Sequence, residues 1–178
     1  MSDSEEQIQS WCKTGDAEAF RRFYRAQAPR LWKFLIARGC DREAAYDLLA
    51  DTFFHFVQSA CRDPRAPVAL LYRIAINLRI DAHRRDKARP TDNVENPDEF
   101  PAPDDAEPDD HAHIRTLIKT LPESEQNLLL LRYWIGLSHK EAAEVLGMPE
   151  GTVRRRCAEA LSKIRDRWEG EEKAHAAR

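Results

Sequence analysis

The sequence predicts an all-α protein with two small helical domains, joined by an acidic, Pro-rich flexible linker. Apolar residues recur at helical spacing in both halves of the chain, and no segment alternates between apolar and polar residues as a strand does. A proline-rich run without bases separates the halves, and a length of 178 residues suits one or two small domains. The expected boundaries are 1–89 for the first domain, 90–112 for the linker, 113–170 for the second domain and 171–178 for a tail.

The first domain is expected to begin with two helical segments and a third, capped helix. The two segments carry Phe20, Phe23 and Tyr24, and then Leu31, Phe34 and Leu35. Pro29 is placed to open the second segment, because proline is tolerated in the first turn of a helix, and Gly39 is a plausible stop. Asp41 can cap the third helix. The apolar stripe of that helix consists of Ala45, Leu48, Leu49, Phe53 and Phe56.

A fourth helix is expected from Val68 to Arg85, after the proline-containing loop Arg62–Pro67 has ended the third. Its buried stripe is expected to be Leu71, Ile74, Ala75, Leu78 and Ala82. Positions two turns apart share a face of a helix, so the polar residues of this segment are expected to lie together on the opposite side. These residues are Arg73, Asn77, Asp81 and Arg84.

The second domain reads as a series of short helices with clear boundaries. The first carries Ile114, Leu117, Ile118 and Leu121, and Pro122 opens a second that carries Leu128, Leu129, Leu131 and Tyr133 and ends at Gly136. Ser138 and Glu141 form a capping box, in which each side chain satisfies a backbone donor of the other residue. The helix that they start closes at Gly147. Pro149 lies near the start of the last helix, whose first turns hold Thr152, Val153, Arg154, Arg155 and Arg156.

This pattern is the sequence form of a helix-turn-helix. A short capped helix, a tight turn at a glycine and a second helix with arginines near its start are its three parts. The N-terminal residues of the second helix then reach base edges in the major groove of DNA, while the first helix crosses the backbone. The alternative is that the arginines form only a solvated face of a structural helix.

The net charge of −3 is distributed unevenly along the chain. Residues 1–89 carry +4, residues 90–112 carry −9 and residues 113–178 carry +2. The acidic segment also holds half of the ten prolines, which deny it helical hydrogen bonds, while its like charges repel one another. An extended, mobile linker is therefore expected there.

Other classes of protein are excluded by what the sequence lacks. The longest apolar run is Leu128–Leu131, far below the roughly 20 residues of a membrane-spanning helix, and the acidic start does not resemble a signal peptide. A cytoplasmic protein without membrane insertion is expected. Its four cysteines show no metal-ligand spacing and are expected to be free thiols, with Cys157 in the core. His111 and His113 are expected to be solvated, and no metal, cofactor or catalytic motif is predicted.

Several stretches of the chain match a known family in order. The second half holds Leu121–Pro122, Leu128–Tyr133, Gly136–Ser138, Glu141–Gly147, Gly151–Val153 and Arg156. These stretches resemble region four of the extracytoplasmic-function (ECF) RNA polymerase sigma factors. The first half holds Tyr24, Ala28–Leu31, Asp47–Leu49, Phe53, Leu71–Ala75, Asn77–Leu78 and Ile80–Asp81. These resemble region two of the same family.

The resemblance implies a bacterial alternative sigma factor, which is not an enzyme by itself. Such a protein binds core RNA polymerase and promoter DNA, and directs promoter-specific initiation of transcription. Region two is implied to recognise and melt the minus-ten element, and region four to grip the minus-thirty-five element. An anti-sigma factor is the further implied partner, and the acidic linker is implied to thread the channel through which RNA leaves the polymerase, with a solubilising tether as the alternative.

Three sets of site residues follow from the resemblance. The minus-ten set is Arg73, Asn77, Asp81, Arg84, Arg85 and Lys87. The minus-thirty-five set is Thr152, Arg154, Arg155 and Arg156. The polymerase-binding set is Asp47, Leu48, Asp51, Thr52 and Phe53, in which Asp47, Asp51 and Thr52 are expected to form a polar rim around Leu48, Leu49 and Phe53.

The chain also departs from the family pattern at a few positions, which keeps two alternatives open. Ala50 and Asp51 stand where many relatives have Gln followed by Glu, and Pro67 and Leu70 stand where Phe and Trp are common. The loop Ala60–Ala66, which is implied to capture a flipped base, is short. One alternative is a sigma-like decoy that sequesters an anti-sigma factor without binding DNA. The other is a dimeric helix-turn-helix repressor, which would need a ligand or dimerisation domain.

Overall fold

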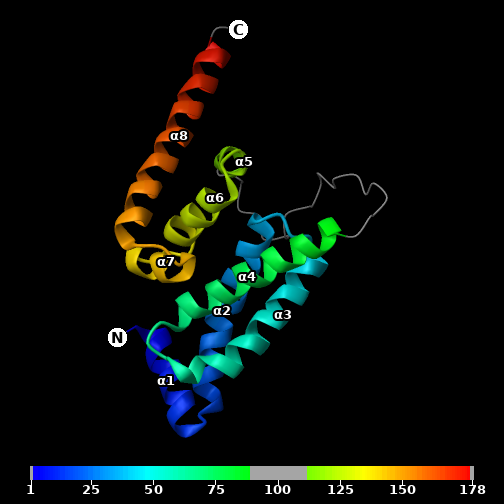
Figure 1. Cartoon of the computed structure of the whole chain (residues 1–178), viewed down its shortest axis with the longest axis vertical. Helices are drawn as coiled ribbons and strands as arrows, with labels where there is room; N and C mark the ends of the chain where they lie inside the picture. The colour runs from blue at the N-terminus through cyan, green and yellow to red at the C-terminus, as the bar shows by residue number, and fades with distance from the viewer. Residues whose placement is uncertain (1, 89–111, 177–178) are drawn as a thin grey trace. The chain divides into compact units, whose positions relative to one another are not determined.

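The computed structural model describes residues 2–88 and 112–176, and all regular elements in these ranges are helical (Figure 1). The all-α prediction is confirmed. The chain divides into two compact units, Met1–Phe100 and Pro101–Arg178. The expected linker lies outside the described residues except for Ala112, as do His111 and the side chain of His113, so the finer domain boundaries stay a prediction. None of the described helices is long and apolar enough to cross a membrane.

The first unit consists of four α-helices and one short 3₁₀ turn. They are α1 (Asp3–Thr14), α2 (Ala17–Ala37), α3 (Arg42–Ser59), η1 (Ala60–Arg62) and α4 (Pro67–Ala88). Each of the first three begins at a side-chain cap, because Ser2, Asp16 and Asp41 accept hydrogen bonds from the backbone N–H groups of the second or third residue of the helix. The cap expected at Asp41 is confirmed. Gly39, at φ +84°, follows the end of α2 as expected.

Pro29 does not open a new helical segment, so this part of the prediction is wrong. It lies inside α2, which continues unbroken for 21 residues. Proline removes one helical hydrogen bond, but Pro29 is exposed, so the carbonyl that loses its partner lies on the side of the helix that faces water. Phe23 on one side of the proline and Leu31 on the other are both fully buried. Their packing into one core holds the helix together across the proline.

The core of the first unit is built from aromatic and aliphatic side chains of α2, α3 and α4. Phe23 and Phe56 stack with ring centroids 5.1 Å apart, and Phe34 meets Tyr72 edge to face at 5.3 Å. The predicted stripe of α3 is buried at all five positions. They are Ala45, Leu48, Leu49, Phe53 and Phe56.

The buried face of α4 differs from the predicted one. Leu71 and Ala75 are buried as expected, whereas Ile74, Leu78 and Ala82 are only half-buried. The other buried positions of α4 are Pro67, Ala69, Tyr72, Ile76 and Arg79. The helix is thus rotated toward Tyr72 and Ile76, because the edge-to-face contact with Phe34 buries a larger side chain than Ile74 or Leu78 would supply.

Two of the four cysteines form a disulfide, which corrects the expectation of four free thiols. Cys12 of α1 and Cys61 of η1 are bonded, although 49 residues separate them in the sequence. Only the folded chain brings η1 against the side of α1, so no spacing motif marks the pair. Cys40 and Cys157 are free, and Cys157 is 2% exposed within the core, as predicted.

The second unit consists of four α-helices and one π-helical turn. They are α5 (Ala112–Lys119), α6 (Glu123–Leu129), η2 (Leu130–Trp134), α7 (His139–Leu146) and α8 (Glu150–Ala176). In the π-turn the N–H of Ile135 donates to the carbonyl of Leu130 at 2.9 Å, which inserts one extra residue before Gly136. The sequence analysis expects an uninterrupted helix here. The last helix continues to Ala176 and therefore includes most of residues 171–178, which were predicted to be a tail.

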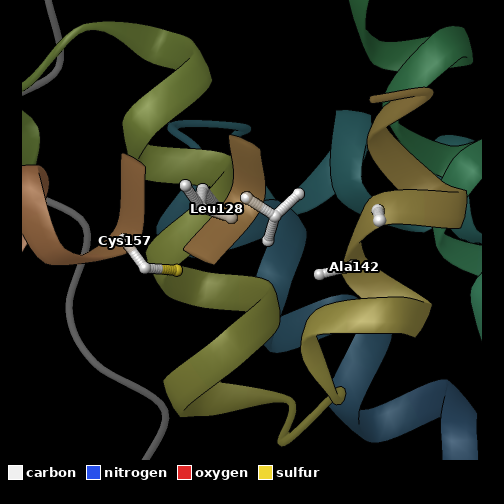
Figure 2. Close-up of a cluster of buried hydrophobic side chains, with 5 residues drawn as sticks. Leu128, Ala142 and Cys157 are labelled. Atoms are coloured by element: carbon white, nitrogen blue, oxygen red, sulfur yellow. The ribbon is translucent and has the colours of Figure 1, made fainter. Parts of the chain in front are cut away.

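Small buried residues join α6, α7 and α8. Leu128, Ala142, Ala143, Val153 and Cys157 form one cluster, shown in Figure 2. Alanines at the contact let the helices approach closely, because they carry no side chain beyond Cβ. The capping box is present as expected. Ser138 Oγ accepts from the N–H of Glu141 at 3.1 Å, and Glu141 Oε2 accepts from the N–H of Ser138 at 2.7 Å.

Tyr72 provides a test of the first core. Its hydroxyl is buried and has no hydrogen-bond partner among the described residues, and burial also raises the pKa of this phenol. Tyr72→Phe removes a desolvated polar group and keeps the ring, so we expect the free energy of unfolding to rise by about 1 kcal/mol. Tyr24→Phe, at an exposed ring, is the control and should change it by less than about 0.5 kcal/mol. Urea titration followed by tryptophan fluorescence measures both, and a loss of stability in Tyr72→Phe would contradict the prediction.

Gly147 provides a test of the turn between α7 and α8. Its φ of +63° is left-handed, and a Cβ built there meets no atom within 4 Å, so the cost of a side chain comes from the backbone alone. Gly147→Ala should lower the free energy of unfolding by about 1 to 2 kcal/mol. Gly151→Ala, in the first turn of α8 and equally open, should instead raise it by up to about 1 kcal/mol. Opposite signs in urea titrations are the expected result, and equal effects would contradict it.

Candidate nucleic-acid and polymerase interfaces

The start of α8 presents two arginines to solvent because the opposite side of the helix is anchored. Val153 and Cys157, four residues apart, are buried against α6 and α7. Arg154 and Arg155 are exposed, while Thr152 and Arg156 are half-buried. The structure therefore brings all four predicted residues to the first two turns of α8, directly after the Gly147 turn.

Glutamates on the same helix hold the two exposed arginines. Arg154 Nη2 lies 2.6 Å from Glu150 Oε1, and Arg155 Nη1 lies 2.6 Å from Glu159 Oε1. Such exposed pairs are worth no more than about 1 kcal/mol, so a phosphate or a base edge can replace the glutamate as partner. The ion pairs orient the guanidinium groups and leave them able to bind another partner.

The outward face of α4 carries the polar residues that were predicted to share it. Arg73, Asn77, Asp81, Arg84 and Arg85 are all exposed. Arg84 Nη1 lies 4.0 Å from Asp81 Oδ1, and Arg85 Nε donates to the backbone carbonyl of Asp81 at 3.3 Å. The backbone of Lys87 is helical, but its side chain lies outside what the structure describes.

A groove between α3 and α4 adds residues that the sequence analysis missed. His55, Gln58, Ser59 and Arg62 line it from one side, and Ile74, Asn77 and Leu78 from the other. Part of the signal was available in the sequence, because His55 and Gln58 are three residues apart on α3, whose other face is apolar. Arg62 follows in η1, so only the fold shows that it shares this side of the groove. Their partner across the groove, Asn77, could be assigned only from the fold.

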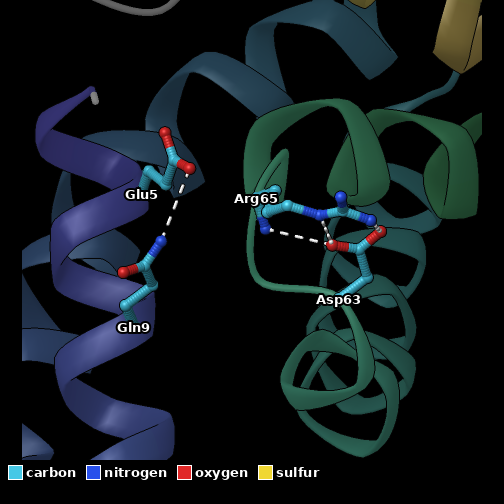
Figure 3. Close-up of polar contacts among 4 residues, drawn as sticks. All are labelled: Glu5, Gln9, Asp63 and Arg65. Atoms are coloured by element: carbon cyan, nitrogen blue, oxygen red, sulfur yellow. Dashed lines mark hydrogen bonds and ion pairs between the residues drawn. The ribbon is translucent and has the colours of Figure 1, made fainter.

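The loop that enters α4 is a compact turn held by one side-chain pair. Arg65 donates from Nε and Nη2 to the two carboxylate oxygens of Asp63 at 2.8 and 3.0 Å (Figure 3). These hydrogen bonds hold the pKa of the Asp63 carboxyl below its ordinary value. Pro67, at the start of α4, is buried and fixes the end of the loop.

The polymerase-binding set on α3 needs a correction. Asp47 and Asp51 are exposed as expected, but Leu48, Thr52 and Phe53 are 8%, 0% and 6% exposed and belong to the core. Thr52 Oγ1 donates to the carbonyl of Leu48 at 2.5 Å within the helix. The predicted polar rim around Leu48, Leu49 and Phe53 is therefore wrong, because that apolar stripe faces α2 and α4 rather than a partner.

A second apolar stripe lies on the outer side of α3. Tyr46, Phe54 and Val57 are 56%, 63% and 43% exposed, and Ala50 lies between them. Their spacing of four, four and three residues is helical and could have been found from the sequence. A groove of about 470 Å³ adjoins this stripe between α2 and α3, with Tyr24, Trp32, Tyr46 and Leu49 as apolar lining and Arg25 and Lys33 as cations.

The chain is similar to known proteins over most of its length. A family model described as Sigma-70, region 4, matches residues 111–164. The ECF RNA polymerase sigma factor RpoE of Cereibacter sphaeroides is 32% identical over 156 residues, which cover 84% of this chain and 86% of that protein. SigM of Mycobacterium tuberculosis, another ECF RNA polymerase sigma factor, is 29% identical over 153 residues, covering 84% and 77%.

Two solved structures share the fold at lower sequence identity. CnrH, solved in complex with the cytosolic domain of CnrY, gives a TM-score of 0.69 at 20% identity and covers 95% of this chain and 99% of that chain. The sigma factor RpoE of Bartonella quintana, solved in complex with the anti-sigma factor NepR, gives 0.66 at 19% identity and covers 84% and 96%. With matches over most of its length, the chain belongs to the family of ECF RNA polymerase sigma factors.

Proposed function

We propose that this chain binds core RNA polymerase and directs transcription from promoters with a minus-ten and a minus-thirty-five element. The observation that carries the proposal is the start of α8, where Arg154 and Arg155 face solvent beside a buried anchor and directly after a capped helix and a glycine turn. In this arrangement the arginines can enter a major groove and donate two hydrogen bonds to a guanine. Sigma factors are regulators, and we propose no reaction for the chain.

The minus-ten role is proposed for α4 and the groove beside it. Asn77 and Arg84 are seven residues apart, two turns along one helix face, so a separated strand can run across both. Amide and guanidinium groups suit this task because they hydrogen-bond to exposed base edges and phosphates without a change of protonation. Arg62, Gln58 and His55 extend the same surface across the groove. Arg73 and Arg85 add positive charge along α4, while Asp81 orients Arg84.

Contact with the polymerase is proposed for the outer side of α3. Asp47 and Asp51 flank the exposed side chains of Tyr46 and Phe54, so the surface has an apolar centre with an acidic margin. Such a surface is complementary to a basic helical partner, because the carboxylates steer the approach and the aromatic side chains supply buried area. Asp47 and Asp51 are retained from the predicted set, and Tyr46 and Phe54 replace Leu48, Thr52 and Phe53.

An anti-sigma factor is the second proposed partner. The homologue from Bartonella quintana was solved with one, and this chain exposes Tyr46, Phe54 and Val57, which an inhibitor would cover in competition with the polymerase. Action on the polymerase implies a cytoplasmic location. The exposed arginines of α8 favour a DNA-binding factor over the sigma-like decoy.

A run-off assay tests the proposal. Core polymerase, this chain and a pool of linear DNA fragments are incubated at low salt; each fragment carries a randomised promoter-length sequence and, downstream, a barcode that is transcribed. The barcodes in the transcripts identify their templates. Transcripts that depend on the chain and whose templates share two upstream elements are the expected result. A chain that binds core enzyme but yields no such transcript would instead behave as the decoy.

Arginine variants of α8 test its role in reading the minus-thirty-five element. Where Arg154→Ala or Arg155→Ala removes a guanine contact, the holoenzyme should lose about 1 to 3 kcal/mol of binding and relax its preference at one position. Where the contact is to a phosphate, all sequences should weaken alike and the slope of log K against log salt should fall by about 0.9. Arg165→Ala, exposed further along α8, is the matched control. Unchanged binding in a variant that removes both arginines would refute the assignment.

An asparagine variant tests the strand-opening role of α4. Asn77→Ala should leave the fold and core binding intact, because the side chain is exposed, and should slow formation of the open complex on linear DNA. Permanganate reactivity of unpaired thymines measures the rate, and a pre-melted bubble template should restore it. Gln9→Ala on α1 removes an amide away from the groove and serves as control. Equal opening rates for Asn77→Ala and the parent would show that this face does not melt the promoter.

A further inference from the structure

The Cys12–Cys61 disulfide lies at the surface of the first unit. Cys61 is exposed and Cys12 is half-buried, so a small solute can approach the bond from the side of Cys61. A chain that acts on RNA polymerase works in a reducing compartment. Persistent structural disulfides are rare there, and solvent-accessible disulfides are commonly transient. A functional role for the Cys12–Cys61 disulfide is therefore considered.

The packing under the disulfide does not depend on it. Ile8 of α1 and Ala60 of η1 are fully buried, and Trp11 packs on Phe20 of α2 with ring centroids 4.9 Å apart. Ser2 caps α1 through a capping box. These contacts hold α1 on α2 and keep Ala60 in the core without the covalent bond, so opening the bond is expected to free only the exposed end of η1, Cys61 and Arg62, rather than to unfold α1.

The segment that the disulfide restrains contributes one residue, Arg62, to the lining of the groove beside α4. Arg62, the residue after Cys61, lines this groove together with Asn77. The Asp63–Arg65 turn follows at once (Figure 3). The disulfide thus fixes the first part of the segment Ala60–Ala66, and the buried Pro67 fixes its end.

We propose that Cys12 and Cys61 form a reversible thiol–disulfide site, opened by dithiol reductants and closed by peroxide, which tunes binding of the separated promoter strand. The closed form holds Arg62 in place at the groove and binds the strand more tightly, because the segment does not have to be ordered on binding. The open form binds it more weakly. The inference rests on the proposed function for its effect, but not for the chemistry of the pair.

The exchange is balanced in both directions. One thiolate of the reductant attacks the exposed Cys61 Sγ, the Sγ–Sγ bond breaks, and Cys12 leaves as a thiolate that takes up a proton. The second thiolate of the reductant then closes its own disulfide and releases Cys61, so two electrons pass to the protein. In the reverse direction one cysteine loses its proton, and its thiolate attacks hydrogen peroxide and becomes a sulfenic acid, while the hydroxide that leaves takes up the proton as water. The other cysteine also loses its proton, and its thiolate attacks the sulfenic sulfur and forms the disulfide, while the hydroxide displaced takes up that proton as a second water.

The two remaining cysteines are poor competitors for this chemistry. Cys157 lies in the core, and Cys40 is half-buried. Burial raises the pKa of both thiols, which leaves less of the reactive thiolate at neutral pH. They therefore serve as internal references in a count of thiols.

Counting thiols tests the site independently of transcription. The full chain is equilibrated with dithiothreitol or, after its removal, with hydrogen peroxide, then denatured without further reductant and labelled with a maleimide polymer that shifts its mobility in a gel. Two labels are expected after peroxide and four after dithiothreitol, through repeated cycles. Four labels under both conditions, or two that dithiothreitol cannot raise, would overturn the proposal.

Strand binding by the holoenzyme tests the effect. The probe is the fluorescein-labelled nontemplate strand of the promoter recovered in the run-off assay, and fluorescence anisotropy gives its affinity. We expect dithiothreitol to weaken binding by about 3- to 10-fold in the parent. Cys12→Ser and Cys61→Ser should bind like the reduced parent and ignore dithiothreitol, which also reports any response of the polymerase itself. Cys40→Ser should respond like the parent.

The possible failures can be told apart. Equal affinity in both redox states overturns the effect on strand binding and leaves the proposed function intact. A chain that recovers no promoter overturns the proposed function and the effect on strand binding, whereas the thiol count alone decides whether the pair is a reversible thiol–disulfide site. Circular dichroism checks that the serine variants are folded. Should either variant unfold, the comparison of oxidised and reduced parent decides the question by itself.

Discussion

Burial of a single face of α4 is the contact on which the first unit depends. Leu71 and Tyr72 are fully buried against the neighbouring helices, and the ring of Tyr72 meets Phe34 of α2 edge to face. Each such side chain contributes about 1.5 to 3 kcal/mol of transfer free energy, which fixes the rotation of α4 about its own axis. Because this rotation is fixed, Asn77 and Arg84 face outward without any polar interaction having to place them there. The apolar core thus sets the direction of the polar residues.

The same rule operates in the second unit with smaller side chains. Val153 and Cys157 are held against Ala142 and Ala143, and the lack of bulk on these alanines brings α7 and α8 close together. Gly147 then only has to turn the chain between two helices whose contact is already determined. Arg154 and Arg155 are exposed because Val153, directly before Arg154, and Cys157, two positions after Arg155, hold the other side of α8 in the core.

The third helix serves two surfaces at once, and this explains the error about its polymerase-binding residues. Its strongest apolar stripe packs inward, as strong stripes generally do, and Thr52 is carried into the core with it because its hydroxyl is satisfied within the helix. The weaker outer stripe of Tyr46, Phe54 and Val57 stays exposed. An apolar residue of a helix is available to a partner only if other apolar residues of that helix already supply its contacts with the core. Which residues supply those contacts depends on the packing of the whole unit.

Several features could be predicted from the residues alone: the helical class, the caps at Asp41 and Ser138, the stop at Gly147, the buried stripe of α3 and the place of the arginines on α8. These features depend on residues within a few positions of one another, and so on local hydrogen bonding and helical period. Other features became visible only in the folded chain: the continuity of α2 through Pro29, the rotation of α4 toward Tyr72, the π-turn before Gly136, the groove shared by Arg62 and Asn77, and the bond between Cys12 and Cys61. Each of these depends on which distant side chains meet in the folded chain, and local spacing carries no record of that.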